Sequence, residues 1–293
     1  MKEEGIDTMY LLLALLPAVC WGSIVFFNTK LGGDAYSQVL GTAIGALIFS
    51  IFLYVISTPP LSPLIWIVGI ISGLFWSVGQ SNQLKAVQYM GVSRTVPLST
   101  GMQLIATTLV GVIVFREWTN LVTILLGTAA ILCIILGAVF TVIGDKNAPK
   151  QDKKSKMSLG TVILLLSTLG YLIYVSLLRY FNINGWAAVL PQGIGITVGT
   201  LLLTFKHDPF NKYMTRNILT GIWWGIGNLG LLLSLPHIGQ ATSFSLSQTG
   251  IIISTLGGIF FLGEKKSKRQ MVFVIIGCCL IIAGGVMMGF TKR

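Results

Sequence analysis

Two stretches of the chain carry the same pattern, and this pattern decides the fold. The first, Gly73–Glu117, contains GLFWSVGQSNQL and then SRTVPLSTGMQLIATTLVGVIVFRE. The second, Gly221–Glu264, contains GIWWGIGNLGLL and then QATSFSLSQTGIIISTLGGIFFLGE. In each copy, an apolar segment opens with an aromatic pair and reaches an amide. The next apolar segment carries polar residues halfway along and ends in a glutamate. This shared order indicates an internal repeat.

The composition predicts a protein that crosses a membrane several times. Hydrophobic residues make up 54% of the 293 residues and charged residues only 10%, against about 25% charged residues in a typical soluble domain. The mean hydropathy is +0.83. The net charge of +11 does not indicate nucleic-acid binding, because Lys and Arg cluster in short loops between apolar runs, as membrane topology requires. The acidic start MKEEGID leads into a full-length span, so we expect no cleavable signal peptide.

Ten segments are long enough to span a membrane, which takes about 20 apolar residues. They are 9–27, 36–57, 64–84, 94–115, 119–143, 159–180, 186–205, 216–235, 240–262 and 270–290. A hydrophilic linker, residues 144–158 (GDKNAPKQDKKSKMS), separates five spans in 1–143 from five in 159–293. Because five is odd, the second copy enters the membrane from the opposite side. We therefore predict an all-α membrane protein of ten transmembrane helices, built as two five-helix inverted-topology repeats.

The distribution of Lys and Arg predicts the orientation. If the N-terminus lies outside, most of the basic residues fall in loops on the same side as the linker, among them Lys265, Lys266, Lys268 and Arg269. The positive-inside rule then predicts that both termini lie outside and that the linker lies in the cytoplasm. The expected location is the cell (cytoplasmic) membrane.

Polar side chains inside spans must face protein or a water-filled cavity. Ser72, Trp76, Gln80 and Gln83 share one helical face of the span 64–84, and five other spans carry similar polar faces. The candidate substrate-binding residues are Trp21, Asn28, Trp76, Gln80, Ser99, Thr100, Gln103, Tyr171, Tyr174, Trp224, Asn228, Ser245, Gln248 and Thr249. For each of them, helix–helix contact or interfacial anchoring is the alternative role.

This set of side chains combines aromatic rings, amides and hydroxyls without charge, which suits a neutral sugar. The apolar C–H face of a pyranose can lie on Trp or Tyr, while Gln and Asn both donate and accept hydrogen bonds. A charged substrate would instead require an opposite charge or a helix terminus directed at it.

None of the nine acidic residues lies in the middle of a span. The nearest are Glu117 and Glu264, at the ends of the spans 94–115 and 240–262. On the predicted topology they face opposite sides of the membrane, so we expect them to act as gates or in proton coupling. The alternative is a salt bridge or helix-end anchor.

Enzyme and metal chemistry find no support in the sequence. There is no Ser/His/Asp arrangement and no phosphate loop, and we expect the protein not to be an enzyme. The four cysteines, Cys20, Cys133, Cys278 and Cys279, lie in apolar segments without metal-ligand or disulfide spacing. We therefore expect no metal site and no cofactor.

Longer motifs carry a resemblance to a known family. VFREW and FLGEK end the spans 94–115 and 240–262, AVQYMGVSRTVPLSTGMQL joins two spans, and PAVCWGSIVFFNTKLGG lies in the first. With the five-plus-five arrangement, these motifs resemble the drug/metabolite transporter superfamily and, within it, the glucose/ribose porter family of bacterial glucose uptake proteins. The resemblance implies uptake of glucose with a co-transported proton.

We therefore expect a secondary active transporter that takes up a neutral sugar, glucose by proton symport, through alternating access. The expected partners are a monosaccharide, a proton and the lipid bilayer, with no nucleic acid and no obligatory protein partner. One alternative is a facilitator or exporter of another small polar metabolite (ribose, a polyol or a drug) without proton coupling. The other is a membrane sensor or scaffold that binds sugar without moving it, which the short linker and tails disfavour.

Overall fold

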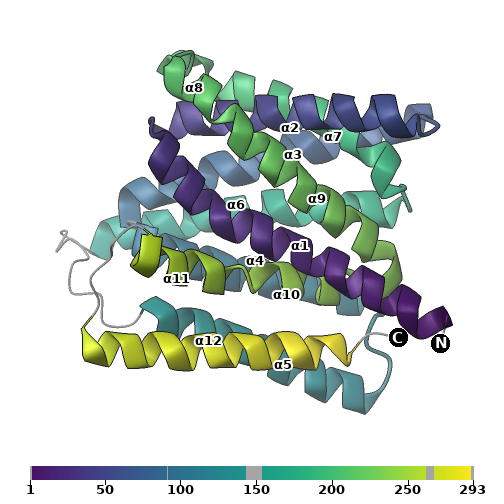
Figure 1. Cartoon of the computed structure of the whole chain (residues 1–293), viewed down its shortest axis with the longest axis vertical. Helices are drawn as coiled ribbons and strands as arrows, with labels where there is room; N and C mark the ends of the chain where they lie inside the picture. The colour runs from purple at the N-terminus through teal and green to yellow at the C-terminus, as the bar shows by residue number, and fades with distance from the viewer. Residues whose placement is uncertain (1, 91, 143–153, 262–266, 292–293) are drawn as a thin grey trace.

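The computed structural model describes residues 2–90, 92–142, 154–261 and 267–291, which form helices and the turns between them, with no strand (Figure 1). The helices are α1 (Lys2–Leu31), α2 (Ala35–Ser57), α3 (Pro63–Met90), α4 (Val92–Ile113), α5 (Leu121–Val142), α6 (Lys154–Tyr180), α7 (Gly185–Thr204), η1 (Phe205–His207), α8 (Lys212–Arg216), α9 (Ile218–Ile238), α10 (Gln240–Gln248), α11 (Ile251–Phe261) and α12 (Lys268–Gly289). An all-helical fold satisfies every backbone hydrogen bond within a segment, as lipid surroundings demand.

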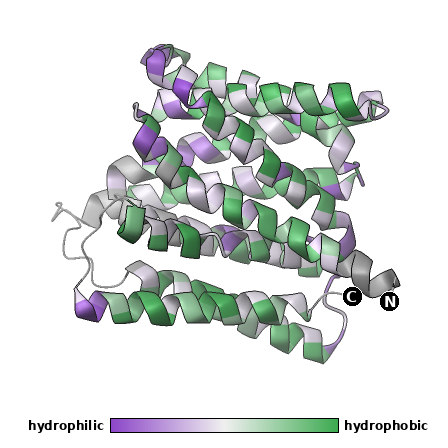
Figure 2. Cartoon of the chain, viewed as in Figure 1, coloured by the Kyte–Doolittle hydropathy of each residue, from purple (hydrophilic) through white to green (hydrophobic). Residues whose placement is uncertain are grey.

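The protein is a multi-pass membrane protein. In the described ranges, eight helical stretches are long and apolar enough to cross a membrane: Ala35–Ser57, Pro63–Ala86, Leu121–Thr141, Ser158–Tyr180, Gly185–His207, Lys212–Ile238, Gln240–Phe261 and Lys268–Gly289. Two shorter apolar helices, Thr8–Ile24 and Leu98–Ile113, accompany them. Each of the ten predicted spans overlaps one of these stretches. Hydrophobic residues predominate along the helices (Figure 2).

Small residues let the helices pack closely across the two halves of the chain. The most extensive contacts join α3 to α6, α3 to α7, α1 to α9, α2 to α9 and α5 to α12. A Cβ atom on Gly73 would lie 2.2 Å from the carbonyl oxygen of Gln192, and one on Gly221 would lie 2.1 Å from that of Thr42. Helix backbones therefore touch directly, as is common in membranes. The α5–α12 pair lies along one edge of the bundle, farthest from α2 and α7 (Figure 1).

The bundle has two distinct ends. At one, which we call the termini end, the Tyr10 ring near the start of α1 stacks on His237 with centroids 3.6 Å apart. The hydroxyls of Thr242 and Thr291 also lie 3.3 Å apart there, and both chain termini lie at this end (Figure 1). At the opposite end, Tyr36 stacks on His207 at 3.9 Å. Helices entering from the termini end, such as α3, therefore finish at the opposite end.

The predicted span 240–262 is two helices in the structure. Helix α10 ends at Gln248 and α11 begins at Ile251. A Cβ atom on Gly250 would lie 2.4 Å from the carbonyl oxygen of Ala18, and one on Gly22 would lie 2.4 Å from that of Gly250. The backbone at the break therefore lies in direct contact with the backbone of α1. In the predicted linker 144–158, α6 begins at Lys154, and the residues up to 153 lie outside the described part of the chain.

Candidate functional site

A cavity of about 290 Å³ lies between α1, α3, α4, α6, α9 and the α10–α11 break. Its lining residues are Trp21, Gly22, Ile24, Trp76, Gln80, Gln83, Thr100, Gln103, Tyr171, Tyr174, Trp224, Phe244, Ser247, Gln248, Gly250, Ile251 and Ser254. None of these carries a formal charge. Such a mixture of aromatic rings with a few polar groups is typical of small-molecule sites.

The cavity gathers most of the residues predicted from the sequence. Nine of them line it: Trp21, Trp76, Gln80, Thr100, Gln103, Tyr171, Tyr174, Trp224 and Gln248. They come from both halves of the chain, so residues more than a hundred positions apart in the sequence meet around one space. Their role in binding stays a prediction.

One wall of the cavity is aromatic and is centred on Trp224. The Trp21 ring stacks on Trp224 with centroids 6.3 Å apart, and the Trp76 ring meets Trp224 edge to face at 5.0 Å. The Trp21 indole N–H donates to the carbonyl oxygen of Trp224 at 3.3 Å. The Tyr174 ring also lies beside Trp224, with ring centroids 6.4 Å apart. Offset and edge-to-face pairs of this kind hold aromatic rings in fixed orientations.

A second part of the cavity wall, the amide wall, consists of amides and a phenol. The Tyr171 hydroxyl lies 2.5 Å from Oε1 of Gln80 and 2.8 Å from Oε1 of Gln83, and a phenol has one proton to donate to them. Nε2 of Gln83 and of Gln103 both donate to the Ser99 hydroxyl, at 3.1 and 2.8 Å. Among the described residues, the Gln80 Nε2 group makes no hydrogen bond, so it is available to a ligand in the cavity.

Five predicted residues do not line the cavity: Asn28, Ser99, Asn228, Ser245 and Thr249. Ser99 and Ser245 are fully buried and Asn228 is 2% exposed. Ser99 lies behind the amide wall, where it accepts hydrogen bonds from Gln83 and Gln103. The Thr249 hydroxyl donates to the carbonyl oxygen of Leu246 in its own helix turn. A helical face read from sequence does not distinguish a residue on the cavity from one a layer behind it.

Eight lining residues were not among the predicted set: Gly22, Ile24, Gln83, Phe244, Ser247, Gly250, Ile251 and Ser254. Gln83 shares the helical face of Gln80, so the sequence already contained a signal for it. The backbone break places Gly250 and Ile251 on the cavity, whereas 240–262 is predicted from the sequence as one continuous span.

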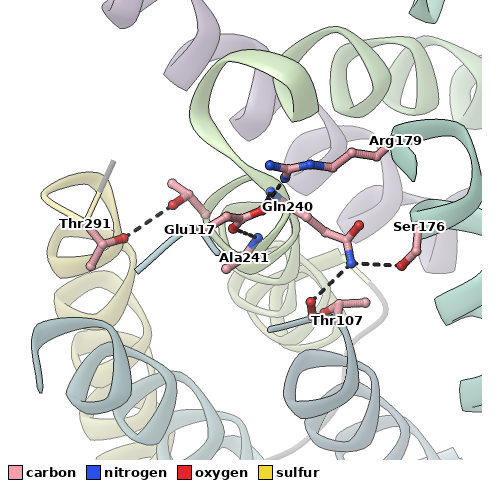
Figure 3. Close-up of polar contacts among 8 residues, drawn as sticks. Thr107, Glu117, Ser176, Arg179, Gln240, Ala241 and Thr291 are labelled. Atoms are coloured by element: carbon pink, nitrogen blue, oxygen red, sulfur yellow. Dashed lines mark hydrogen bonds and ion pairs between the residues drawn. The ribbon is translucent and has the colours of Figure 1, made fainter. Parts of the chain in front are cut away.

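A second polar cluster, at the termini end, is centred on Glu117 (Figure 3). Its carboxylate forms an ion pair with Arg179 of α6 and accepts the backbone N–H groups of Gln240 at 2.6 Å and Ala241 at 2.8 Å. It therefore caps the first turn of α10, where a negative charge is favourable. The Gln240 side-chain amide donates to the carbonyl oxygen of Thr107 at 3.1 Å and to the Ser176 hydroxyl at 2.9 Å. The name Glu117 cluster is used below for Glu117, Arg179, Gln240, Ala241, Thr107 and Ser176.

Glu264, the other predicted gate, lies outside the described residues. In the ranges that the structure describes, no group of three or more His, Cys, Asp or Glu residues is arranged to hold a metal ion.

Comparison with known proteins identifies the family. The family model described as "Sugar transport protein" matches residues 12–291. The "Glucose uptake protein GlcU" of Bacillus subtilis (strain 168) is 60% identical over 97% of this chain and 99% of its own length. A "Putative sugar uptake protein" of Bacillus cereus (strain ATCC 10987 / NRS 248) is 58% identical over 97% of this chain and all of its own length. These relatives are named as uptake proteins and not as enzymes.

A solved crystal structure shares the fold. It superimposes with a TM-score of 0.77 over 95% of this chain and 97% of its own, at 16% sequence identity. At that identity the likeness concerns the fold alone. The family match and the close relatives confirm the resemblance read from the sequence motifs, and the chain belongs to the sugar transport protein family of bacterial glucose uptake porters.

Proposed function

We propose that the protein takes up a neutral monosaccharide, glucose, across the cytoplasmic membrane as a secondary transporter working by alternating access. The observation that carries this proposal is the cavity whose described lining residues are uncharged and include three tryptophans and four glutamine amides. Its volume of about 290 Å³ lies near the lower limit of small-molecule pockets, roughly 300 Å³, as suits one sugar ring. The names of the relatives supply glucose as the substrate.

The two walls match the two kinds of surface on a pyranose. Trp21, Trp76 and Trp224 offer apolar faces to the ring C–H groups. The Gln80 Nε2 group is a donor to a sugar oxygen. Gln248, whose amide lies 3.3 Å from the Ser247 hydroxyl, can both donate and accept. Amides that can do both suit hydroxyl groups, which also do both.

The distribution of exposure supports a state that faces the cytoplasm. Tyr174 and Phe244 are each 3% exposed and Trp76 is 4% exposed, whereas Gln83 and Ser254, farther toward the opposite end, are half-buried. Solvent therefore reaches the cavity from the end away from the termini. With the termini outside, as the basic residues predict, that end is cytoplasmic.

The Glu117 cluster is then the closed outer gate. It ties the α4–α5 turn to α6 and to the start of α10, three elements that must separate for the cavity to open outward. Protonation of Glu117 removes the negative charge on which the ion pair with Arg179 and the cap of α10 depend. Glu117 is therefore our candidate for proton coupling, because none of the described residues that line the cavity is acidic.

The pattern of helix contacts supports ten spans in two inverted repeats, 1–143 and 159–293. If the first five spans match the second five in order, a pseudo-two-fold axis pairs the α1–α9 contact with α6–α3, and the α2–α9 contact with α7–α3. All four contacts are present. The α5–α12 contact maps onto itself and is also present. An axis of this kind in the membrane plane lets one architecture open alternately to each side.

The test is radiolabelled glucose uptake by the purified protein in proteoliposomes, with and without an inward proton gradient. We expect accumulation above equilibrium with the gradient, abolished by a protonophore. Equilibration that ignores the gradient would support the second candidate, a facilitator without proton coupling. Absence of glucose entry with folded protein would overturn glucose as the substrate, and competition with ribose or polyols would then identify the class.

A further inference from the structure

Four side chains from four helices form a closed hydrogen-bond relay behind the cavity wall: Ser72 (α3), Tyr174 (α6), Gln192 (α7) and Asn228 (α9). The Tyr174 hydroxyl donates to Oδ1 of Asn228, and Nδ2 of Asn228 donates to Oε1 of Gln192 at 2.7 Å. Nε2 of Gln192 donates to the Ser72 hydroxyl at 2.9 Å. The Ser72 hydroxyl donates to the main-chain carbonyl of Tyr174 at 2.8 Å. The relay therefore begins and ends on Tyr174.

The direction of the relay follows from its chemistry. A main-chain carbonyl can only accept, so the proton of Ser72 is committed to Tyr174 and the Ser72 oxygen must accept from Gln192. The amide of Gln192 then turns its oxygen to Asn228, whose own oxygen is left to accept the phenol proton of Tyr174. Each amide orientation is thus set by the one before it.

Burial makes this relay costly to break. Ser72 and Gln192 are fully buried, Asn228 is 2% exposed and Tyr174 is 3% exposed. Removing one member leaves the next polar group without a partner in a low-dielectric interior, where no water replaces it.

Tyr174 is the member that reaches the cavity; Ser72, Gln192 and Asn228 do not line it. Because its proton is donated to Asn228, Tyr174 offers the cavity its aromatic ring. That ring lies beside Trp224, at the centre of the aromatic wall. We propose that Ser72, Gln192 and Asn228 are positioning residues, which hold Tyr174 in the wall that receives the sugar. This inference rests on the proposed function, and it gives Asn228 a role through Tyr174 in place of direct contact with the substrate.

Helix α3 offers a matched pair of substitutions, Ser72→Ala and Ser77→Ala. Both serines are fully buried and both contact neighbouring helices. The Ser77 hydroxyl donates to the carbonyl oxygen of Ile196 at 2.9 Å and lies 3.1 Å from the Thr200 hydroxyl, so it has no link to Tyr174. We expect Ser72→Ala to raise the Kd for glucose, measured by tryptophan fluorescence on the purified full chain, by about tenfold. Ser77→Ala leaves the Kd within about twofold, since its lost bonds do not reach the cavity.

A double-mutant cycle separates positioning from general loss of structure. Gln192→Met keeps the approximate size of the side chain and removes both relay bonds, and Tyr174→Phe removes the phenol proton. If the relay acts as a unit, Tyr174→Phe adds little to the rise in Kd once Gln192→Met is present. Saturated uptake per transporter should change much less than the Kd. Equal effects of Ser72→Ala and Ser77→Ala, or additive effects of Gln192→Met and Tyr174→Phe, would overturn the proposal.

Failure of the substrate assignment gives a different result. If the wild-type protein binds neither glucose nor ribose, the proposed function fails. The relay is then tested by acrylamide quenching of the cavity tryptophans. Quenching should increase in Ser72→Ala and Gln192→Met relative to Ser77→Ala, and equal quenching in all three would contradict the relay.

Discussion

At the residue scale, the amide of Gln80 is the clearest candidate for direct contact with the sugar. Its oxygen accepts a hydrogen bond from Tyr171, and within the described part of the chain its Nε2 group has no partner, so it can donate to a ligand in the cavity. We expect Gln80→Ala to weaken glucose binding by roughly tenfold, the effect of one lost hydrogen bond of about 1.4 kcal/mol. The control is Asn82→Ala on the same helix, because Asn82 donates to the carbonyl oxygen of Val78 and does not line the cavity. Equal affinities of the two variants would remove Gln80 from the site.

Glu117 is the residue on which coupling to protons should depend. Glu117→Gln keeps the size of the side chain but removes its charge and its ability to titrate at neutral pH. We expect this variant to lose gradient-driven accumulation of glucose while it retains equilibrative entry, as measured in proteoliposomes. Asp208→Asn is the control, because Asp208 is exposed at the opposite end. Accumulation that survives Glu117→Gln would place coupling elsewhere.

At the element scale, Asp34 starts α2. It is the N-cap, and its side chain accepts the backbone N–H groups of Tyr36 and Ser37. Burial raises the pKa of Asp34, but hydrogen bonds from Ser37 and Tyr36 outweigh it, and the net pKa is lowered. The cap therefore stabilises the fold fully above the unfolded pKa of about 3.9, and this contribution is lost as the pH falls through the lower folded value.

We expect Asp34→Ala to lower the free energy of unfolding by about 1 kcal/mol at pH 7, the usual effect of a lost cap. Asp34→Asn should match the wild type at pH 7, since Asn is an equally good cap. Because the Asn side chain does not titrate, Asp34→Asn should keep the stabilising effect of the cap at low pH, where the wild type loses it. Thermal melts of the purified protein at pH 7 and pH 3 check both outcomes, and an unchanged melt for Asp34→Ala would contradict the role of the cap.

The joint between α9 and α10 depends on a glycine. Gly239 has φ +87° and ψ 160°, a backbone region that is essentially restricted to glycine, and a Cβ atom there would lie 2.9 Å from the carboxyl carbon of Glu117. We expect Gly239→Ala to displace Glu117 and to destabilise the protein by more than the ~1–3 kcal/mol that this backbone conformation costs alone. Gly289→Ala, where no atom lies within 4 Å of the added Cβ, is the control. The two melting temperatures compare them, and equal values would mean that the joint tolerates a side chain.

At the scale of the whole molecule, the topology can be measured directly. Pro60, between α2 and α3, and Lys206, after α7, are both exposed and lie at opposite ends of the bundle. In a variant without native cysteines, Pro60→Cys should react with a membrane-impermeant reagent in intact cells. Lys206→Cys should react only after permeabilisation, because the positive-inside rule places it in the cytoplasm. The reverse pattern would invert the orientation and, with it, the assignment of the Glu117 cluster as the outer gate.

Much of the architecture could be predicted from the sequence. The predicted span 36–57 coincides with α2 (Ala35–Ser57) and the span 94–115 with α4 (Val92–Ile113), each to within two residues. Hydropathy is reliable here because a lipid-embedded backbone must satisfy its own hydrogen bonds, so that a long apolar run forms a helix. The break between α10 and α11 was missed, because the stretch as a whole is long and apolar enough to be taken for one span.

Individual site residues were predictable only in part. Amide side chains in apolar spans are expensive to bury, which pointed to Gln80. The aromatic pair that occupies the same place in both stretches pointed to Trp76 and Trp224. Gln192 was missed although it is an amide in an apolar span, and Arg179 was missed as the partner of Glu117. Both act through residues distant in the chain, and one sequence does not contain those distances.

The sequence by itself determined that the chain crosses the membrane many times and that no acidic residue lies in the middle of a predicted span. These properties follow from composition and order along the chain. Only the tertiary structure decided which polar groups face the cavity and which face each other. Gln80 can reach a ligand, whereas Asn228 is held in a relay with Tyr174 and Gln192. This difference arises from the packing of the helices. It depends on how close glycine-rich helices from both halves approach, which is a property of the assembled bundle.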